Sequence, residues 1–156
     1  MGQQSFPLFL GGIKLSLDNP YMKYKKTQIE TADQGKLIMM LYDGAIKFVN
    51  KAIELMSHKK RNIEEIHKNI MKAQDIIVEL MSSLNMEIEF SQKLLSIYMY
   101  INKRLVDANM KKTDEPLIEV KQYLVELRDA WEKAAKQVDS NNLDPSQNNG
   151  GVNIAT

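Results

Sequence analysis

The stretch that decides the fold runs from Asp114 to Val138 and reads DEPLIEVKQYLVELRDAWEKAAKQV. Its apolar side chains recur at steps of three and four residues without a break, as a helix with one buried face requires. They are Leu117, Val120, Leu124, Leu127, Trp131, Ala134 and Val138. Pro116 lies in the expected first turn, where its missing N–H is tolerated. A narrow row of this kind suits near-antiparallel packing at about 20° in a helical bundle.

Three earlier stretches carry the same pattern. The first opens at Asp33, which can cap a helix, and runs to about residue 57. The second follows Asn62, and Glu65 three residues later makes an arrangement close to a capping box. The third covers residues 91–110. The apolar rows are Leu37, Met40, Leu41, Ala45, Phe48, Ala52, Ile53 and Met56; then Ile66, Ile70, Ala73, Ile77, Leu80, Met81 and Leu84; then Leu94, Tyr98, Ile101, Leu105 and Ala108.

The linkers at 57–62, 85–90 and 111–113 are short, so sequential helices must lie antiparallel. The expected fold is all-α, an antiparallel up-down four-helix bundle, and 156 residues suffice for one such domain. We expect the bundle to span 19–138, after a flexible N-terminal extension at 1–18. Residues 139–156 are rich in Asn, Ser, Gly and Pro and are expected to form a disordered tail.

Composition excludes several classes of protein. There is no cysteine, which rules out disulfides and thiolate chemistry and is compatible with a reducing compartment. No segment approaches the roughly 20 apolar residues that span a bilayer, and the apolar run from Phe6 to Leu10 lacks the features of a signal peptide. We therefore expect a cytoplasmic protein without stable membrane insertion.

Few residues suggest chemistry. Glu64 and His67 have the Glu-x-x-His spacing used in di-iron bundles, but the chain has only two histidines, and half of such a site cannot hold two metals. A surface pair is the better interpretation. No nucleophile motif or phosphate loop is present, so we expect no enzyme, no cofactor and no metal site.

The basic residues predict no nucleic-acid site. The net charge is only +1. The clusters at 59–61 and 23–26 are short, stand near acidic residues and lack a stripe of stacking aromatic side chains. We interpret both clusters as solvated surface.

A surplus of apolar side chains is more informative. They lie beside the buried rows of the third and fourth helices, where a bundle needs only one stripe per helix. These are Leu95, Ile97, Met99, Tyr100, Ile118, Tyr123 and Val125. Ten methionines add flexible side chains suited to repacking against a ligand. Together they predict an apolar groove, although each could instead widen the core.

Two local features bear on this groove. Gly44 interrupts the first helix, at a cost of about 1 kcal/mol relative to alanine, which indicates close approach by a neighbour. Ahead of the bundle, a turn at Asn19-Pro20 leads into a short predicted helical segment that caps the bundle. It would carry Tyr21 and Tyr24 on one side.

These residues carry a resemblance to the flagellar secretion chaperone family. The first part is Asn19-Pro20-Tyr21-x-x-Tyr24, then Thr31-Ala32, then the run from Leu37 to Phe48 with Leu41-Tyr42-Asp43-Gly44. The segment from Ile97 to Asn109 is similar to a second hallmark, and Asp129-Ala130-Trp131 to a third. The resemblance covers about residues 19–138.

The resemblance implies a helical bundle that binds the disordered C-terminal segment of flagellin in the cytoplasm. It further implies prevention of premature polymerisation and presentation of flagellin to a component of the flagellar export gate. The partner-binding residues that it suggests are Tyr21, Tyr24, Leu41, Tyr42, Ala45, Tyr98, Ile101 and Leu105, of which those in the bundle could equally be core. Two alternatives stay open: a helical adaptor or chaperone for another secreted client, and a metal-dependent bundle enzyme built on Glu64 and His67.

Overall fold

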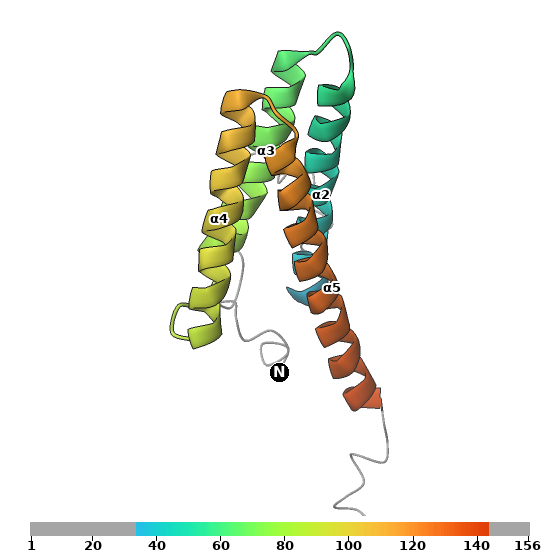
Figure 1. The fold of residues 1–156 in the computed structure, drawn as a ribbon. Coiled ribbons are helices and arrows are strands. Elements are labelled where there is room, and N and C mark those ends of the chain that lie inside the picture. The colour runs from blue at the N-terminus through green and yellow to red at the C-terminus, as the bar shows by residue number, and fades with distance from the viewer. Residues whose placement is uncertain (1–33, 144–156) are drawn as a thin grey trace, which may run out of the picture.

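The computed structural model describes residues 34–143, and only the backbone at 138, 139 and 141–143. This part of the chain contains four α-helices: α2 (Gln34–Ser57), α3 (Ile63–Ser82), α4 (Glu89–Lys111) and α5 (Glu115–Leu143). Successive helices run in opposite directions (Figure 1), so the prediction of an all-α, up-down four-helix bundle is confirmed.

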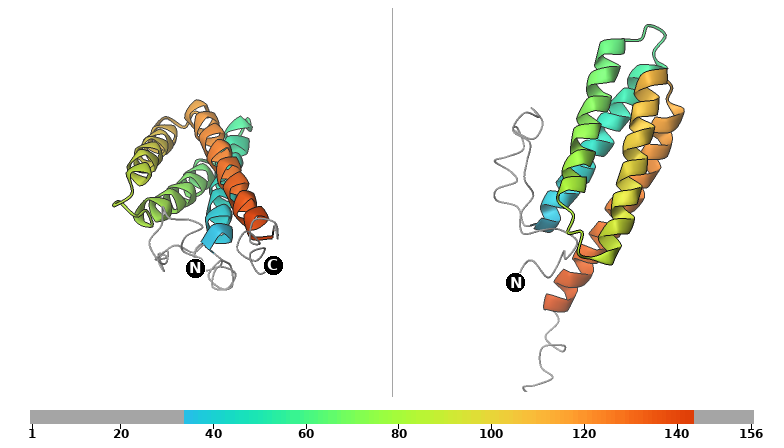
Figure 2. Two further views of the ribbon diagram at one scale, coloured as in Figure 1. Left: turned by 90° about the horizontal axis from the view of Figure 1, so that it is seen from below. Right: turned by 90° about the vertical axis from the view of Figure 1, so that its left-hand side faces the viewer.

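The helices form a ring in chain order. Each packs mainly on its two neighbours, and the packing of α2 against α3 and against α5 is the most extensive. The α2–α3 and α4–α5 turns lie at one end of the bundle, and the α3–α4 turn lies at the other (Figure 1). The C-terminal half of α5 diverges from α4 and projects beyond the other helices (Figure 2).

The helix boundaries follow from local chemistry. Asn62 has an extended backbone, and its side-chain oxygen accepts a hydrogen bond from the Glu65 N–H at 3.1 Å, so the predicted cap of α3 is confirmed. Helix α4 begins at Glu89, two residues before the expected start at 91. The residue that precedes it, Ile88, has an extended backbone. The helix ends at Lys111, and the left-handed backbone of the capping residue Lys112 (φ 53°) lets the Lys112 N–H reach the Ala108 carbonyl at 2.7 Å.

The core is aliphatic with two tyrosines and follows the predicted rows. Its largest fully buried side chains include Tyr42, Tyr98, Ile70, Ile77 and Leu80. The C-terminal part of the apolar row of α5 is less enclosed, since Leu127 and Trp131 are only partly buried against the core. Gly44 is buried on α2, which agrees with the close approach expected there.

One boundary differs from expectation. Helix α5 continues to Leu143, beyond the expected start of a disordered tail at 139. The polar residues there extend a helix that already exists, and each added residue gains one backbone hydrogen bond. The extension at 1–18, the cap segment that would carry Tyr21 and Tyr24, the cap residue Asp33 and the remaining tail lie outside the described residues.

Candidate functional site

The predicted binding residues of the bundle lie inside it. Leu41 is 1% exposed, and the other five are fully buried. They are Tyr42, Ala45, Tyr98, Ile101 and Leu105. They come from the inward faces of α2 and α4, so in this conformation a partner does not reach them.

A buried polar network joins three helices at this point. The hydroxyls of Tyr42 and Tyr98 lie 2.5 Å apart, and the indole Nε1 of Trp131 donates to the Tyr42 hydroxyl at 3.2 Å. Burial raises the pKa of Tyr42 to about 12 and that of Tyr98 well above its usual value, so both hydroxyls stay protonated and available as donors. The network therefore ties α2 to α4 and α5.

An ion pair strengthens the same junction. Arg128 Nε on α5 donates to the carboxylate of Asp43 on α2, and Arg128 also pairs with Glu132 at 3.3 Å. Asp129, by contrast, is exposed. The Leu-Tyr-Asp-Gly and Asp-Ala-Trp segments of the sequence thus meet in space, where Tyr42, Asp43 and Trp131 stabilise the bundle.

The accessible apolar surface lies elsewhere, on the outer side of α3 and α4. Six exposed side chains form it, and we call them the α3–α4 stripe. They are Ile63 (50% exposed), Met71 (41%), Val78 (50%), Met99 (58%), Val106 (38%) and Met110 (80%). On each helix they recur at intervals close to whole turns, which keeps them on one side.

Two side-chain bridges set the register of the stripe. Gln74 Nε2 donates to Asn102 Oδ1 at 3.1 Å, and Asn109 Nδ2 donates to His67 Nδ1 at 2.9 Å. Because α3 and α4 are antiparallel, these pairs place Met71 level with Val106. The exposed apolar side chains of the two helices therefore lie level with one another, on either side of these polar bridges.

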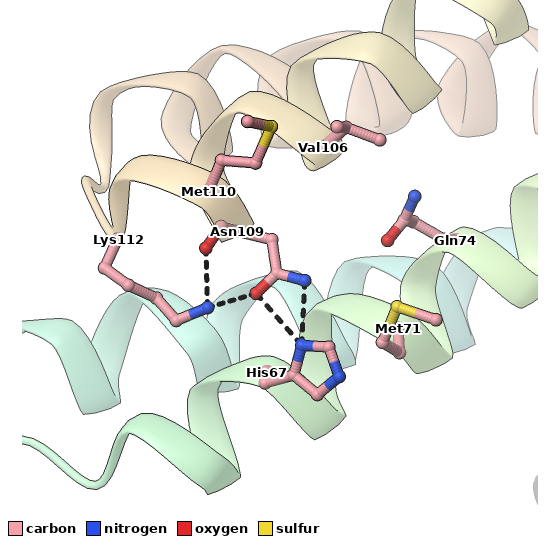
Figure 3. A pocket seen from close by; sticks show the side chains of 7 residues that line it. All are labelled: His67, Met71, Gln74, Val106, Asn109, Met110 and Lys112. Carbon is pink, nitrogen blue, oxygen red and sulfur yellow. Dashed lines mark hydrogen bonds between the residues drawn. The ribbon is translucent and has the colours of Figure 1, made fainter.

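A shallow open pocket of about 350 Å³ lies at the end of the stripe near Met110. It is lined by His67, Met71, Gln74, Val106, Asn109, Met110 and Lys112. Figure 3 shows the Asn109 side chain at its centre, bonded to His67 and to the Nζ of Lys112. Partial burial lowers the pKa of Lys112. Three of its lining side chains are apolar and four are polar, so the pocket combines apolar surface with hydrogen-bonding groups.

A second, smaller group of exposed apolar residues lies between α4 and α5. The rings of Tyr100 and Tyr123 meet edge to face at 5.8 Å, and Ile118 is 45% exposed. Arg104 Nε donates to Glu119 Oε2 at 2.8 Å, and the Tyr100 hydroxyl donates to the same carboxylate. These two donors, Tyr100 first, lower the pKa of Glu119. Polar contacts therefore fix this flank of α4 to α5.

The structure does not bring Glu64 and His67 together. Glu64 pairs with Lys68 at 3.4 Å, whereas His67 bonds to Asn109. Among residues 34–143 no group of three or more His, Cys, Asp or Glu side chains could hold a metal ion. Nor is any helix in that part of the chain long and apolar enough to cross a membrane.

Sequence reasoning found part of the exposed surface. Met99, Tyr100, Ile118 and Tyr123 are exposed as expected, whereas Leu95, Ile97 and Val125 are partly buried. The residues of the stripe that were missed are Ile63, Met71, Val78, Val106 and Met110. The seven-residue steps from Met71 to Val78 and from Met99 to Val106 were the available signal.

The fold and surface define an all-helical up-down bundle with an exposed apolar stripe between two of its helices. A sequence model of the family described as Flagellar protein FliS matches residues 17–138. The chain therefore belongs to the FliS family. This is a family of chaperones, which are not a class of enzyme.

Individual relatives agree with this assignment. The chain is 38% identical over 120 residues to the flagellar secretion chaperone FliS of Bacillus subtilis, which covers 77% of this chain and 89% of that protein. It is 28% identical over 112 residues to the protein of the same name from Escherichia coli, covering 70% of this chain and 81% of that one. The flagellar secretion chaperone FliS of Vibrio cholerae is 29% identical over 116 residues, which cover 70% of this chain and 84% of that protein.

Proposed function

We propose that this protein is a cytoplasmic export chaperone that binds the disordered C-terminal segment of flagellin. The bound segment cannot polymerise prematurely, and flagellin stays competent for flagellar type III secretion. The chaperone then presents it to a component of the export gate. Family membership supports the class of function, and the α3–α4 stripe supplies a surface for the client.

The stripe has the chemistry that such a client needs. A disordered segment that folds on binding loses about 2–5 kcal/mol or more in ordering, which buried apolar area must offset. Each large apolar side chain that becomes fully buried contributes about 1.5–3 kcal/mol. Six such side chains are exposed along two antiparallel helices, and an amphipathic client helix can lie in the furrow between them.

The proposal assigns different roles to the residues that the family resemblance suggested. Tyr42 and Tyr98 tie α2 to α4, and Leu41, Ala45, Ile101 and Leu105 fill the core behind the stripe. Tyr21 and Tyr24 stay predicted as residues of an N-terminal element that lines or caps the groove.

The test is a calorimetric titration with a peptide of the C-terminal segment of flagellin from the same organism. Wild-type protein should bind saturably with a negative heat-capacity change, because apolar surface is buried. The variants Met99→Asp and Met110→Asp should each weaken binding about tenfold or more, since a charge replaces a buried apolar contact. Both positions are well exposed, so the bundle should keep its helical content.

The matched control is Ile118→Asp, which places the same charge on an exposed apolar position outside the stripe. Its affinity should equal that of the wild type. Absence of binding by the wild type at tens of micromolar would reject flagellin as the client. Weakening by Ile118→Asp, with binding unchanged in the two stripe variants, would move the binding surface from the stripe to the α4–α5 flank.

A further inference from the structure

The two ends of the α3–α4 stripe carry opposite charge. At the end near Met110, the α2–α3 turn lies against the C-terminus of α4. Arg61 fixes this contact, because its Nη1 donates to the Lys112 carbonyl at 2.8 Å and its Nε donates to the Met56 carbonyl at 3.0 Å. Two basic segments that are distant in the sequence thus become one basic end, made of Lys59, Lys60, Arg61, Lys111 and Lys112.

The carboxylates near the basic end are mostly paired with other cations. Glu64 and Glu65 both approach Lys68, at 3.4 and 3.6 Å. Glu115 lies 3.9 Å from Arg104. Asp114 is exposed beside them. The five cations therefore exceed the acidic groups around them.

The opposite end, at the α3–α4 turn, is acidic. Glu87 and Glu89 are both exposed there, next to the exposed side chain of Met86. The nearest basic residue after them in the sequence is the exposed Lys93, one turn of α4 beyond Glu89, so two carboxylates stand near one ammonium group. Figure 1 shows this turn at the far end of the bundle from the α2–α3 and α4–α5 turns.

A helix lying on the stripe meets these charges with its own dipole. The N-terminal end of a helix carries a partial positive charge and the C-terminal end a partial negative charge. The six apolar side chains of the stripe are uncharged, and the exposed Lys103 lies among them near the middle of α4, so the difference in charge lies between the two ends. Only one orientation places both ends of the bound helix beside opposite charge.

We propose that the client helix docks on the stripe with its C-terminal end at the basic end and its N-terminal end at Glu87 and Glu89. It therefore runs parallel to α4 and antiparallel to α3. This inference rests on the proposed function, because it assumes that a client helix binds the stripe, and adds the direction of binding.

The absence of cysteine in the chain permits a direct test. Single variants Met110→Cys and Met86→Cys place one thiol at each end of the stripe. The full-length variants are mixed with the flagellin peptide carrying a thiol-reactive bromoacetyl group at either its N-terminus or its C-terminus. The C-terminally labelled peptide should couple to Met110→Cys at least tenfold faster than to Met86→Cys, and the N-terminally labelled peptide should show the reverse preference.

The possible outcomes separate this inference from the proposed function. Preference in the opposite sense, or equal coupling at both ends with calorimetric binding intact, would overturn the direction and leave the chaperone function standing. Loss of calorimetric binding by unlabelled peptide to the wild type would reject both.

A charge-exchange variant tests the cause. Lys60→Glu, Lys111→Glu, Glu87→Lys and Glu89→Lys together leave the net charge at +1, because two reversals of each sign cancel. In this background, with helical content verified by circular dichroism, the preference between the two ends should fall at least threefold at low salt. An unchanged preference would show that charge does not set the direction and would overturn the electrostatic cause given for it.

Discussion

At the residue scale, one hydroxyl pair connects helices that are far apart in the sequence. Tyr42 and Tyr98 are 56 positions apart, yet both are fully buried and their hydroxyls share a hydrogen bond. A buried hydroxyl without a partner is costly, so each tyrosine depends on the other. Trp131 adds a third helix through its donation to Tyr42. The Tyr42 hydroxyl is therefore the central group of the junction.

We expect Tyr42→Phe to lower the free energy of unfolding by about 1–3 kcal/mol, because it removes one hydroxyl and leaves polar groups of Tyr98 and Trp131 without that contact. Tyr98→Phe should cost less, since Trp131 keeps its acceptor. In the double variant the loss should be smaller than the sum of the two single losses, because both remove the same bond. Urea unfolding of the four proteins measures these values. Strictly additive losses would mean that the pair contributes no joint stabilisation.

At the element scale, the sequence predicted the helices well because their signals are local. The cap at Asn62 and the three- and four-residue rows involve neighbours within one helix, and these predictions are confirmed. Contacts between helices depend on residues far apart in the sequence, and no local pattern signals them. The contacts Tyr42–Tyr98 and Asp43–Arg128 were therefore not predicted. The six site residues of the bundle that the family resemblance suggested are buried in this conformation, and their role in binding a partner stays a prediction.

The stability that the contacts between α4 and α5 contribute should depend on pH. Glu119 accepts from Tyr100 and Arg104, which lower its pKa below the ordinary 4.5 in the folded state. A lowered folded-state pKa contributes stability that is present above pH 4.5 and is lost as the pH falls through the folded value. We expect Glu119→Gln to be less stable than the wild type at pH 7, with the difference decreasing as the pH falls below 4.5 and through the folded-state pKa.

Denaturant unfolding at pH 7, 5 and 3 measures this difference. Glu126→Gln is the matched control, because Glu126 is exposed on the same helix. The free energy of unfolding of Glu126→Gln should equal that of the wild type at all three pH values. A Glu119→Gln deficit that persisted unchanged at pH 3 would show that the lost interaction does not need the ionised carboxylate.

At the scale of the whole molecule, α4 separates two surfaces with different properties. Its flank toward α3 carries the apolar stripe, whereas its flank toward α5 is fixed by Arg104, Glu119 and Tyr100. A client can therefore be accommodated in two ways. It can dock on the stripe with the bundle closed, or α4 can separate from α5 and expose Tyr98, Ile101 and Leu105. The first requires no loss of core packing, so we expect it to prevail.

A covalent lock between α4 and α5 distinguishes these two routes. The variant Arg104→Cys/Glu119→Cys, in a chain that otherwise has no cysteine, can be bridged by a short bifunctional thiol reagent because the original side chains meet at 2.8 Å. The bridge lies on the flank opposite the stripe and prevents α4 from leaving α5. We expect the locked protein to bind the flagellin peptide within about twofold of the same variant before bridging, since docking on the stripe needs no opening. The unbridged variant controls for loss of the Arg104–Glu119 pair. A tenfold or greater loss of affinity on bridging, with helical content unchanged, would mean that the client enters the core, and the buried residues Tyr98, Ile101 and Leu105 would then be its contacts.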